Sequence, residues 1–207
     1  MSIGTAWYLD VNHFARDTPW AHGFLAAYAL WAGLVVLSLL LIAAWLVVRH
    51  RVDAPRAVAT AFLAGLGTVI ALLLNQHVIS PAVARPRPCH ALHHVEVLLA
   101  CNNDFSFPSD HCMLAGAFAA GLLLVSLRFG VPAVLLALLL AFSRVYTGVH
   151  YPGDAAAGLL IGAAICTVTV LLLRRPATAL ARRLARTPLR PLFVAGDKGG
   201  GRPVGLS

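Results

Sequence analysis

Long apolar stretches separated by short polar segments dominate the chain. Four stretches without a charged residue come close to, or exceed, the length of about 20 residues that crosses a bilayer; they are 24–48, 57–74, 112–127 and 155–173. A fifth stretch, 131–142, reaches that length if its helix continues through Arg144 to about Thr147. The pattern predicts an all-α, polytopic membrane bundle of five transmembrane helices, and the odd number places the two termini on opposite sides.

A helical periodicity also precedes the first of these stretches. The apolar positions are Trp7, Tyr8, Val11, Phe14 and Ala15, and the polar positions opposite them are Asp10, Asn12, His13 and Arg16. This pattern predicts an N-terminal helix that lies in the outer membrane interface and ends at Thr18 and Pro19. A frayed N-terminus is the alternative interpretation.

The composition agrees with a membrane protein. Of the 207 residues, 59% are hydrophobic and 12% are charged, and the mean hydropathy is +0.80. A soluble domain carries about a quarter charged residues, so this balance excludes a soluble enzyme. The long blocks of Leu, Val and Ala also exclude an intrinsically disordered chain.

The distribution of the basic residues predicts the orientation, because cytoplasmic loops hold the excess of Lys and Arg. One side of the predicted topology holds 12 of the 16 basic residues. These are Arg49, Arg51, Arg56, Arg128, Arg174, Arg175, Arg182, Arg183, Arg186, Arg190, Lys198 and Arg202. We therefore expect the N-terminus and the loop between the second and third spans to face outward.

The last part of the chain is rich in Arg and then in Gly. We expect residues 1–175 to form the membrane domain and residues 176–207 to form a basic, flexible cytoplasmic tail. A basic tail also suits nucleic acid, but basic residues beside a membrane fit anionic lipid better. The expected partners are therefore membrane lipids and not nucleic acid.

Charged residues near a membrane are costly, so their placement calls for an explanation. On the outward side they gather in three clusters, at residues 84–88 (ARPRP), 107–111 (FPSDH) and 143–154 (SRVYTGVHYPGD). In the predicted topology each cluster lies at the outer end of a different helix, or just beyond it. We therefore expect the three clusters to meet at one face of the membrane.

Each cluster has a structural explanation when it is considered alone. Arg85 and Arg87 suit the interface, Ser109 and Asp110 suit a helix start, and His150 suits a hydrogen-bonded pair with a nearby carboxylate. The combination suits an oxyanion substrate, because arginine binds phosphate through several planar donors and a free helix N-terminus attracts anions. One histidine can then attack phosphorus while a second protonates the departing oxygen, without a metal or another cofactor.

The three clusters resemble the signature motifs of the type 2 phosphatidic acid phosphatase superfamily, membrane phosphatases related to vanadium haloperoxidases. The family pattern is Lys-x6-Arg-Pro, then Pro-Ser-Gly-His, then Ser-Arg-x5-His-x3-Asp. The third motif is matched in full by Ser143, Arg144, His150 and Asp154.

The resemblance implies a role for each matched residue. His150 would form a phosphohistidine, Asp154 would orient His150, and His111 would act as the general acid. Substrate phosphate would be bound by Arg87, Ser109 and Arg144. Arg85 is a weaker candidate for this role, because it falls outside the register when Arg87 and Pro88 are aligned with the family's Arg-Pro.

The chain departs from the family pattern at two positions. Ser80 stands where the first motif has its lysine if the count starts from Arg87, and Val78 stands there if it starts from Arg85. Asp110, which we include among the expected substrate-binding residues, replaces the glycine of the second motif. A carboxylate beside an anionic substrate repels it unless the carboxylate faces away, is protonated or reaches a different group.

The altered motifs resemble the undecaprenyl-diphosphatase branch of the superfamily. This resemblance implies a phosphatase that hydrolyses polyprenyl diphosphate at the outer face of the bacterial plasma membrane. The same enzyme class also includes phosphatases for phosphatidylglycerol phosphate, phosphatidic acid and polyprenyl phosphosugars. From other classes, an anion or lipid transporter would need polar groups deep in several spans, and a purely structural protein would leave the third motif unexplained.

Two further groups of residues lie in the outward loop. Cys89 and Cys101 stand where disulfides are allowed, and the sequence leaves open whether they pair. His90, His93 and His94 resemble a metal cluster, but no carboxylate or cysteine spacing completes a recognisable site. No metal site is therefore predicted.

Overall fold

The structure is a computed structural model that describes residues 3–195. Within this range the regular elements are all helical. They are α1 (Ile3–Asp17), the 3-10 turn η1 (Pro19–Ala21), α2 (His22–Ala27), the π-helical turn η2 (Tyr28–Ala32), α3 (Gly33–Val48), α4 (Ala54–Leu74), the π-helical turn η3 (Asn75–Ile79), α5 (Ser80–Val83), α6 (Pro88–Ala91), α7 (Asp110–Val125), α8 (Leu127–Tyr146), α9 (Pro152–Leu184) and α10 (Arg190–Phe193).

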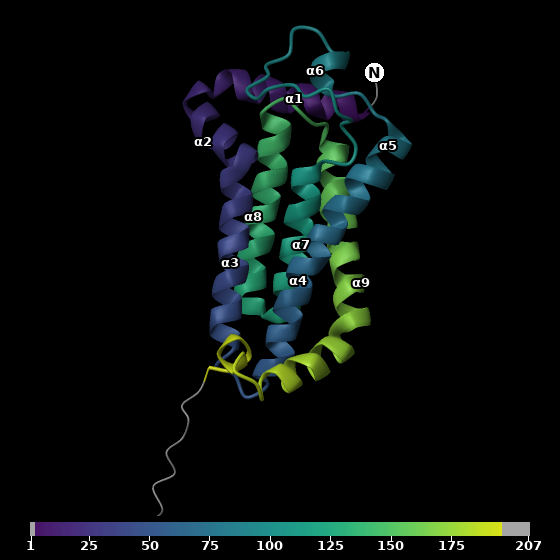
Figure 1. Cartoon of the computed structure of the whole chain (residues 1–207). Coiled ribbons are helices and arrows are strands. Elements are labelled where there is room, and N and C mark those ends of the chain that lie inside the picture. The colour runs from purple at the N-terminus through teal and green to yellow at the C-terminus, as the bar shows by residue number, and fades with distance from the viewer. Residues whose placement is uncertain (1–2, 196–207) are drawn as a thin grey trace, which may run out of the picture.

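The long helices run side by side as a bundle (Figure 1). Four helical stretches of the described chain are long and apolar enough to cross a membrane, namely Pro19–Val48, Ala54–Ala91, Leu127–Tyr146 and Pro152–Leu184. The helix α7 is also apolar but has only 16 residues. It packs against α3, α4, α8 and α9, so its apolar residues are buried by protein on several sides.

Glycines let α7 and α9 approach each other closely. A Cβ atom added to Gly116 would overlap the backbone of Leu159, and one added to Gly162 would overlap the carbonyl oxygen of Met113. Gly116 lies in α7 and Gly162 lies in α9, so each helix contributes a glycine to the contact. The packing of α9 against α7 matters for the site, because both helices begin at the end of the bundle where the three charged clusters meet.

We expect Gly162→Ala to destabilise the fold, because the added methyl group meets rigid backbone and forces the two helices apart. Overpacking of this kind costs about 1–3 kcal/mol. The matched control is Gly23→Ala, where an added Cβ has no neighbour within 4 Å. Thermal unfolding of the two variants in detergent should show a lower midpoint for Gly162→Ala alone, and equal midpoints would contradict the packing described here.

The helix predicted at the N-terminus is present as α1, which lies across one end of the bundle (Figure 1). Tyr8 and Ala15 are buried under it, while Trp7 and Phe14 are exposed. Asn12 was expected on the polar, solvent-facing side, but it is buried. Its side chain exchanges hydrogen bonds with the backbone of Glu96, because the outward loop covers α1 at this point.

The segment expected to be a flexible tail is partly structured. Helix α9 continues through Pro176 to Leu184, and the chain then folds back against the end of α3. The Trp45 indole donates a hydrogen bond to the Leu192 carbonyl, and the Phe193 ring packs on Phe62. Residues 176–195 therefore have defined helices and contacts, with Ala181 buried among them, and residues 196–207 lie outside the described part. The flexibility of the tail stays a prediction.

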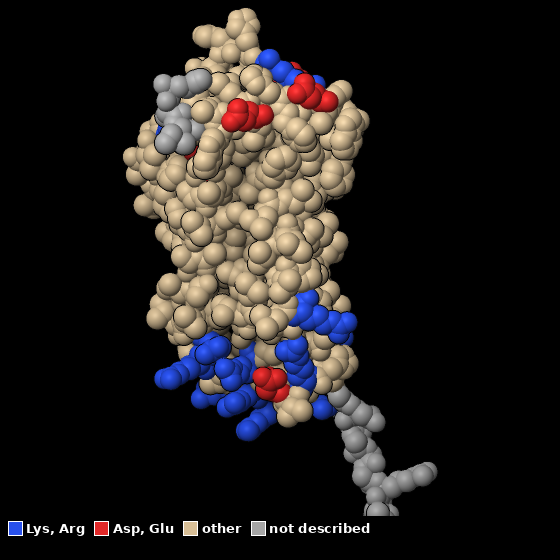
Figure 2. Space-filling view, turned by 180° about the vertical axis from the view of Figure 1, so that it is seen from behind, with Lys and Arg blue, Asp and Glu red and all other residues tan. Residues whose placement is uncertain are grey.

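The two ends of the bundle differ in charge, as the sequence predicts. Arg side chains gather at the end opposite α1 (Figure 2). Basic residues of that end come from the ends of α3 and α9 and from the starts of α4 and α8, and the exposed carboxylate among them is Asp53.

The loop between α5 and α7 covers the other end of the bundle. Cys89 and Cys101 form a disulfide within this loop, which answers the question that the sequence left open. The ring of His90 lies beside it, with Nε2 3.3 Å from the Cys101 sulfur.

Candidate active site

The three charged clusters meet at the end of the bundle that α1 covers. Arg87 comes from the loop after α5, Ser109 and Asp110 begin α7, and Arg144 lies in the last turn of α8. His150 follows in the short connection to α9, and Asp154 lies in the first turn of α9. The sequence separates these side chains by up to 67 residues, but the ends of three helices bring them together.

His150 lies at the centre of the site and is 1% exposed. Its Nε2 atom is 3.1 Å from a guanidinium nitrogen of Arg87 and 3.1 Å from one of Arg144. Its Nδ1 atom lies 2.9 Å from the carbonyl oxygen of Ser106, which can only accept a hydrogen bond. Nδ1 therefore carries the proton, and the lone pair of Nε2 points toward the two arginines.

The surroundings of His150 favour its neutral form. Burial removes water from the ring, and Arg144 and Arg87 repel a second positive charge, so the pKa of His150 lies well below its ordinary value. A neutral imidazole is the form that can attack phosphorus, because its Nε2 carries a lone pair and no proton.

This shift predicts how stability depends on pH. In the unfolded chain His150 binds a proton below about pH 6.5, while in the folded chain it stays neutral. The unfolded state then binds more protons, so the free energy of unfolding falls as the pH drops below about 6.5. His150→Gln should flatten this fall by up to about 1.4 kcal/mol per pH unit. Thermal unfolding of both proteins across this range tests the point, and parallel curves would contradict it.

Asp154 is fully buried and has three partners. It accepts hydrogen bonds from the Ser106 hydroxyl at 2.5 Å, from the Tyr151 backbone N–H at 2.9 Å and from the Arg85 guanidinium at 2.8 Å. Its nearer oxygen is 4.0 Å from His150 Nδ1. Asp154 therefore lies next to His150 in this structure, but the hydrogen bond of the ring goes to Ser106.

Arg85 was predicted as a weaker candidate for binding phosphate, and in the structure its guanidinium lies 2.8 Å from Asp154. The same guanidinium lies 4.1 Å above the centre of the Tyr151 ring. These two contacts hold Arg85 to the start of α9, so the structure shows it supporting Asp154.

Arg87 and Arg144 are both buried, and each guanidinium also binds a protein acceptor other than His150. Asp104 accepts two hydrogen bonds from Arg87, at 2.8 and 2.9 Å, which leaves another guanidinium nitrogen directed at His150. The carbonyl of Ala29 accepts a hydrogen bond from Arg144 at 3.3 Å. The Nε atom of Arg144 is buried and has no hydrogen-bond partner within residues 3–195. A phosphate oxygen would satisfy this donor.

His111 lies in the first turn of α7 and is half-buried. Its Nε2 atom is 3.0 Å from the carbonyl of Leu30, which belongs to the π-helical turn η2. The same turn supplies the Ala29 carbonyl to Arg144. π-Helical turns are rare and often occur at functional sites, and here η2 presents carbonyls to two of the predicted site residues.

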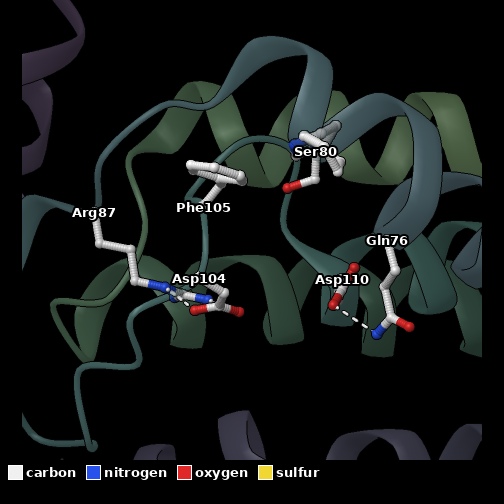
Figure 3. A pocket seen from close by; sticks show the side chains of 8 residues that line it. Gln76, Ser80, Arg87, Asp104, Phe105 and Asp110 are labelled. Carbon is white, nitrogen blue, oxygen red and sulfur yellow. Dashed lines mark hydrogen bonds and ion pairs between the residues drawn. The ribbon is translucent and has the colours of Figure 1, made fainter.

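A second π-helical turn, η3, holds Asp110. The amide of Asn75 donates to one oxygen of Asp110 at 2.6 Å. The amide of Gln76 donates to the other oxygen at 3.1 Å, as Figure 3 shows. The two amides therefore disperse the charge of this carboxylate. They also explain how the site accommodates Asp110 at the glycine position of the family motif.

A cavity of about 340 Å³ opens beside this network. Its lining residues are Gln76, Ser80, Pro81, Arg87, Asp104, Phe105, Pro108 and Asp110 (Figure 3). Ser80 lies in this wall, where the count from Arg87 placed the missing lysine. The cavity leads to Arg87, whose guanidinium contacts the proposed nucleophile.

Ser109 is the residue before α7 and is fully buried. Its backbone N–H donates to the Asp154 carbonyl at 3.2 Å, which ties the start of α7 to the start of α9. All eight residues predicted for the site thus lie at one end of the bundle.

Sequence analysis missed Ser106 and Asp104, which position predicted site residues. Ser106 directly precedes the 107–111 cluster, and this proximity to the motif was the one feature of the sequence that could have indicated its role. Asp104 is an isolated carboxylate in a loop, and nothing in the local pattern marks it as the partner of Arg87.

Comparison with known proteins agrees with the geometry. The sequence model of the PAP2 superfamily matches residues 58–176, and the chain belongs to that superfamily. The match includes the three clusters that form the site.

Among curated relatives, undecaprenyl-diphosphatase BcrC of Bacillus subtilis is 33% identical over 67% of this chain and 66% of its own length. An undecaprenyl-diphosphatase of Sulfolobus acidocaldarius is 35% identical over 49% of this chain and 50% of its own length. The matched regions thus span from half to just under two thirds of these relatives. A lipid A 1-phosphatase of Rhizobium johnstonii is 32% identical over 58% of this chain and 54% of its own length.

Solved structures share the fold. The crystal structure of Aquifex aeolicus LpxE aligns with a TM-score of 0.60 and 23% identity, covering 83% of this chain and 96% of that one. A transmembrane PAP2-type phosphatidylglycerolphosphate phosphatase from Bacillus subtilis aligns with a TM-score of 0.61 and 21% identity, covering 84% of this chain and 88% of that one. The all-helical membrane architecture is therefore that of known transmembrane PAP2 phosphatases.

Proposed function

We propose that this protein is a membrane phosphatase that hydrolyses polyprenyl diphosphate, such as undecaprenyl diphosphate, to the monophosphate through a phosphohistidine. The observation that carries the proposal is the environment of His150, whose unprotonated Nε2 atom faces two buried guanidinium groups. A phosphoryl group bound by Arg87 and Arg144 would have its phosphorus within reach of that lone pair.

In the first step, His150 Nε2 attacks the terminal phosphorus. A P–N bond forms while the bond from phosphorus to the bridging oxygen breaks, and prenyl monophosphate leaves. Arg87 and Arg144 neutralise the charge on the transferred oxygens. The ring becomes positively charged, and this charge is stabilised by the Ser106 carbonyl at Nδ1 and by the nearby Asp154 carboxylate.

His111 supplies the proton for the leaving oxygen. In this step His111 acts as the imidazolium. The Leu30 carbonyl accepts the hydrogen bond of Nε2–H, and Nδ1–H gives its proton to the leaving oxygen, which leaves His111 neutral. In the second step the same nitrogen takes a proton from water as the water attacks the phosphohistidine. Phosphate is released, and the starting protonation states are restored.

The proposed membrane topology has five spans, with α1 in the outer interface. In this topology α7 is the third span, although it has only 16 residues. Because basic side chains gather at the opposite end, the active site faces the outside of the plasma membrane. A lipid diphosphate presents its charged group at this depth while its prenyl chain stays in the bilayer.

Thiol labelling of intact cells tests the orientation. Asn103 is an exposed loop residue beside the site, and Arg186 is exposed at the basic end. A membrane-impermeant maleimide should label Asn103→Cys in intact cells and Arg186→Cys only after lysis. The opposite pattern would place the active site inside.

Phosphate release by the purified protein in EDTA tests the activity. Undecaprenyl diphosphate should be hydrolysed fastest, and phosphatidylglycerol phosphate, phosphatidic acid and a polyprenyl phosphosugar serve as competing substrates. Relatives named as lipid A 1-phosphatase and decaprenylphosphoryl-5-phosphoribose phosphatase support the inclusion of other lipid phosphates. Faster hydrolysis of a competing lipid would identify that lipid as the preferred substrate. Loss of activity in EDTA would overturn the metal-independent scheme.

A further inference from the structure

Ser106 is a fully buried residue near the end of the loop that covers the site, four residues before α7 begins. Its backbone N–H donates to the Arg85 carbonyl at 2.8 Å, which fixes the position of its own peptide group. Its carbonyl then lies against His150, and its hydroxyl binds Asp154 while lying 3.5 Å from His150 Nδ1. No motif residue lies at this position, and the mechanism has so far used only its carbonyl.

The contacts of Ser106 connect the nucleophile to the buried carboxylate. The carbonyl accepts the hydrogen bond of His150 Nδ1 at 2.9 Å, and the hydroxyl donates to Asp154 at 2.5 Å. The direct separation between His150 Nδ1 and Asp154 is 4.0 Å, which exceeds a hydrogen bond. The hydrogen-bonded route from the carboxylate to the ring therefore passes through Ser106.

We propose that Ser106 is a positioning residue that couples Asp154 to His150. Asp154 is itself fixed by Arg85 and by the Tyr151 N–H, so it can hold the Ser106 hydroxyl in one place. The Ser106 carbonyl in turn keeps the proton on Nδ1 and directs Nε2 at the substrate. This inference rests on the proposed function, because the orientation matters for an attack by Nε2.

Removing the hydroxyl separates this role from simple space filling. In Ser106→Ala the carbonyl and the backbone hydrogen bond to Arg85 remain, but Asp154 loses one of its donors and no longer holds residue 106 through its side chain. The value of kcat should fall about 10- to 100-fold, as expected when a buried hydrogen bond to a charged group is lost. KM should stay within about twofold, because substrate-binding groups are unchanged. A structural role alone would lower thermal stability without changing kcat per folded molecule.

A double-mutant cycle tests whether the effect passes through Asp154. If it does, Ser106→Ala combined with Asp154→Asn should reduce kcat no more than Asp154→Asn alone, within about twofold. The matched control is Ser38→Ala, which removes a hydroxyl that bonds only to the Leu34 carbonyl of its own helix. This control should keep the wild-type rate. Size-exclusion chromatography and thermal unfolding verify the fold of each variant.

Orthovanadate gives a second measurement that does not depend on the lipid. It mimics a five-coordinate phosphoryl group and would bind at His150 Nε2, and Ser106→Ala should weaken its binding about tenfold or more. A wild-type rate and vanadate affinity in Ser106→Ala would overturn the inference, and so would losses that multiply in the double variant. If the wild type binds vanadate and Ser106→Ala weakens this binding, but no lipid phosphate is hydrolysed, the coupling stands and the proposed substrate fails.

Discussion

His150→Ala should abolish phosphate release, with a loss of about 10⁴-fold or more. The reason is that the variant lacks the atom that forms the bond to phosphorus, and no neighbouring side chain can replace it. The two arginines that face Nε2 would still bind phosphate, so substrate affinity should change less than the rate. Labelling with substrate that carries ³²P on its terminal phosphate should detect an acid-labile phosphohistidine in the wild type and none in the variant.

The control for this experiment is His50→Ala. His50 is exposed and follows α3 at the basic end of the bundle, so its replacement should leave the rate unchanged. Retention of the covalent label in His150→Ala would identify a different nucleophile. His111→Ala would then be the next variant, because His111 is the other histidine among the predicted site residues.

Arg144→Lys should reduce kcat by about 10²- to 10³-fold, although the charge is conserved. The guanidinium of Arg144 reaches both His150 Nε2 and the Ala29 carbonyl from a buried position. A lysine ammonium is a single point of charge on a flexible chain and cannot keep both contacts while it also binds phosphate. Steady-state kinetics with the lipid substrate measures the effect.

Arg175→Lys is the matched control, because Arg175 is exposed on α9 near the basic end of the bundle. It should behave as the wild type. A wild-type rate in Arg144→Lys would show that charge alone is sufficient at this position, and the geometry described for the transferred phosphoryl group would then be wrong.

The sequence predicts the helices well where hydropathy decides the outcome. The predicted end of the helix near Thr147 agrees with α8, which ends at Tyr146, and the N-terminal periodicity corresponds to α1. Residues 176–184 were assigned to a tail because of their arginines and Pro176. The helix continues there because Ala181 and its apolar neighbours pack against the bundle, and tertiary packing outweighs the local signal of a single proline.

The site residues were found because their spacing matches a known motif, but their partners were not. Ser106 and His150 are 44 residues apart, and His111 and Leu30 are 81 residues apart. Such pairs depend on how the helices pack and leave no periodicity in the sequence. The contact between Arg85 and Asp154 was missed for the same reason, because only the folded chain brings these two residues together.

The disulfide in the covering loop has a consequence for how the site meets its substrate. Cys89 follows Arg87 by two residues, and Cys101 precedes Asp104 by three. The covalent link therefore closes the loop between the two partners of the Arg87–Asp104 ion pair. Because the link already limits the conformations of this loop, bringing the pair together loses less entropy. The disulfide thus holds Arg87 near its binding position from the time it forms, and the protein does not have to order this loop again at each turnover.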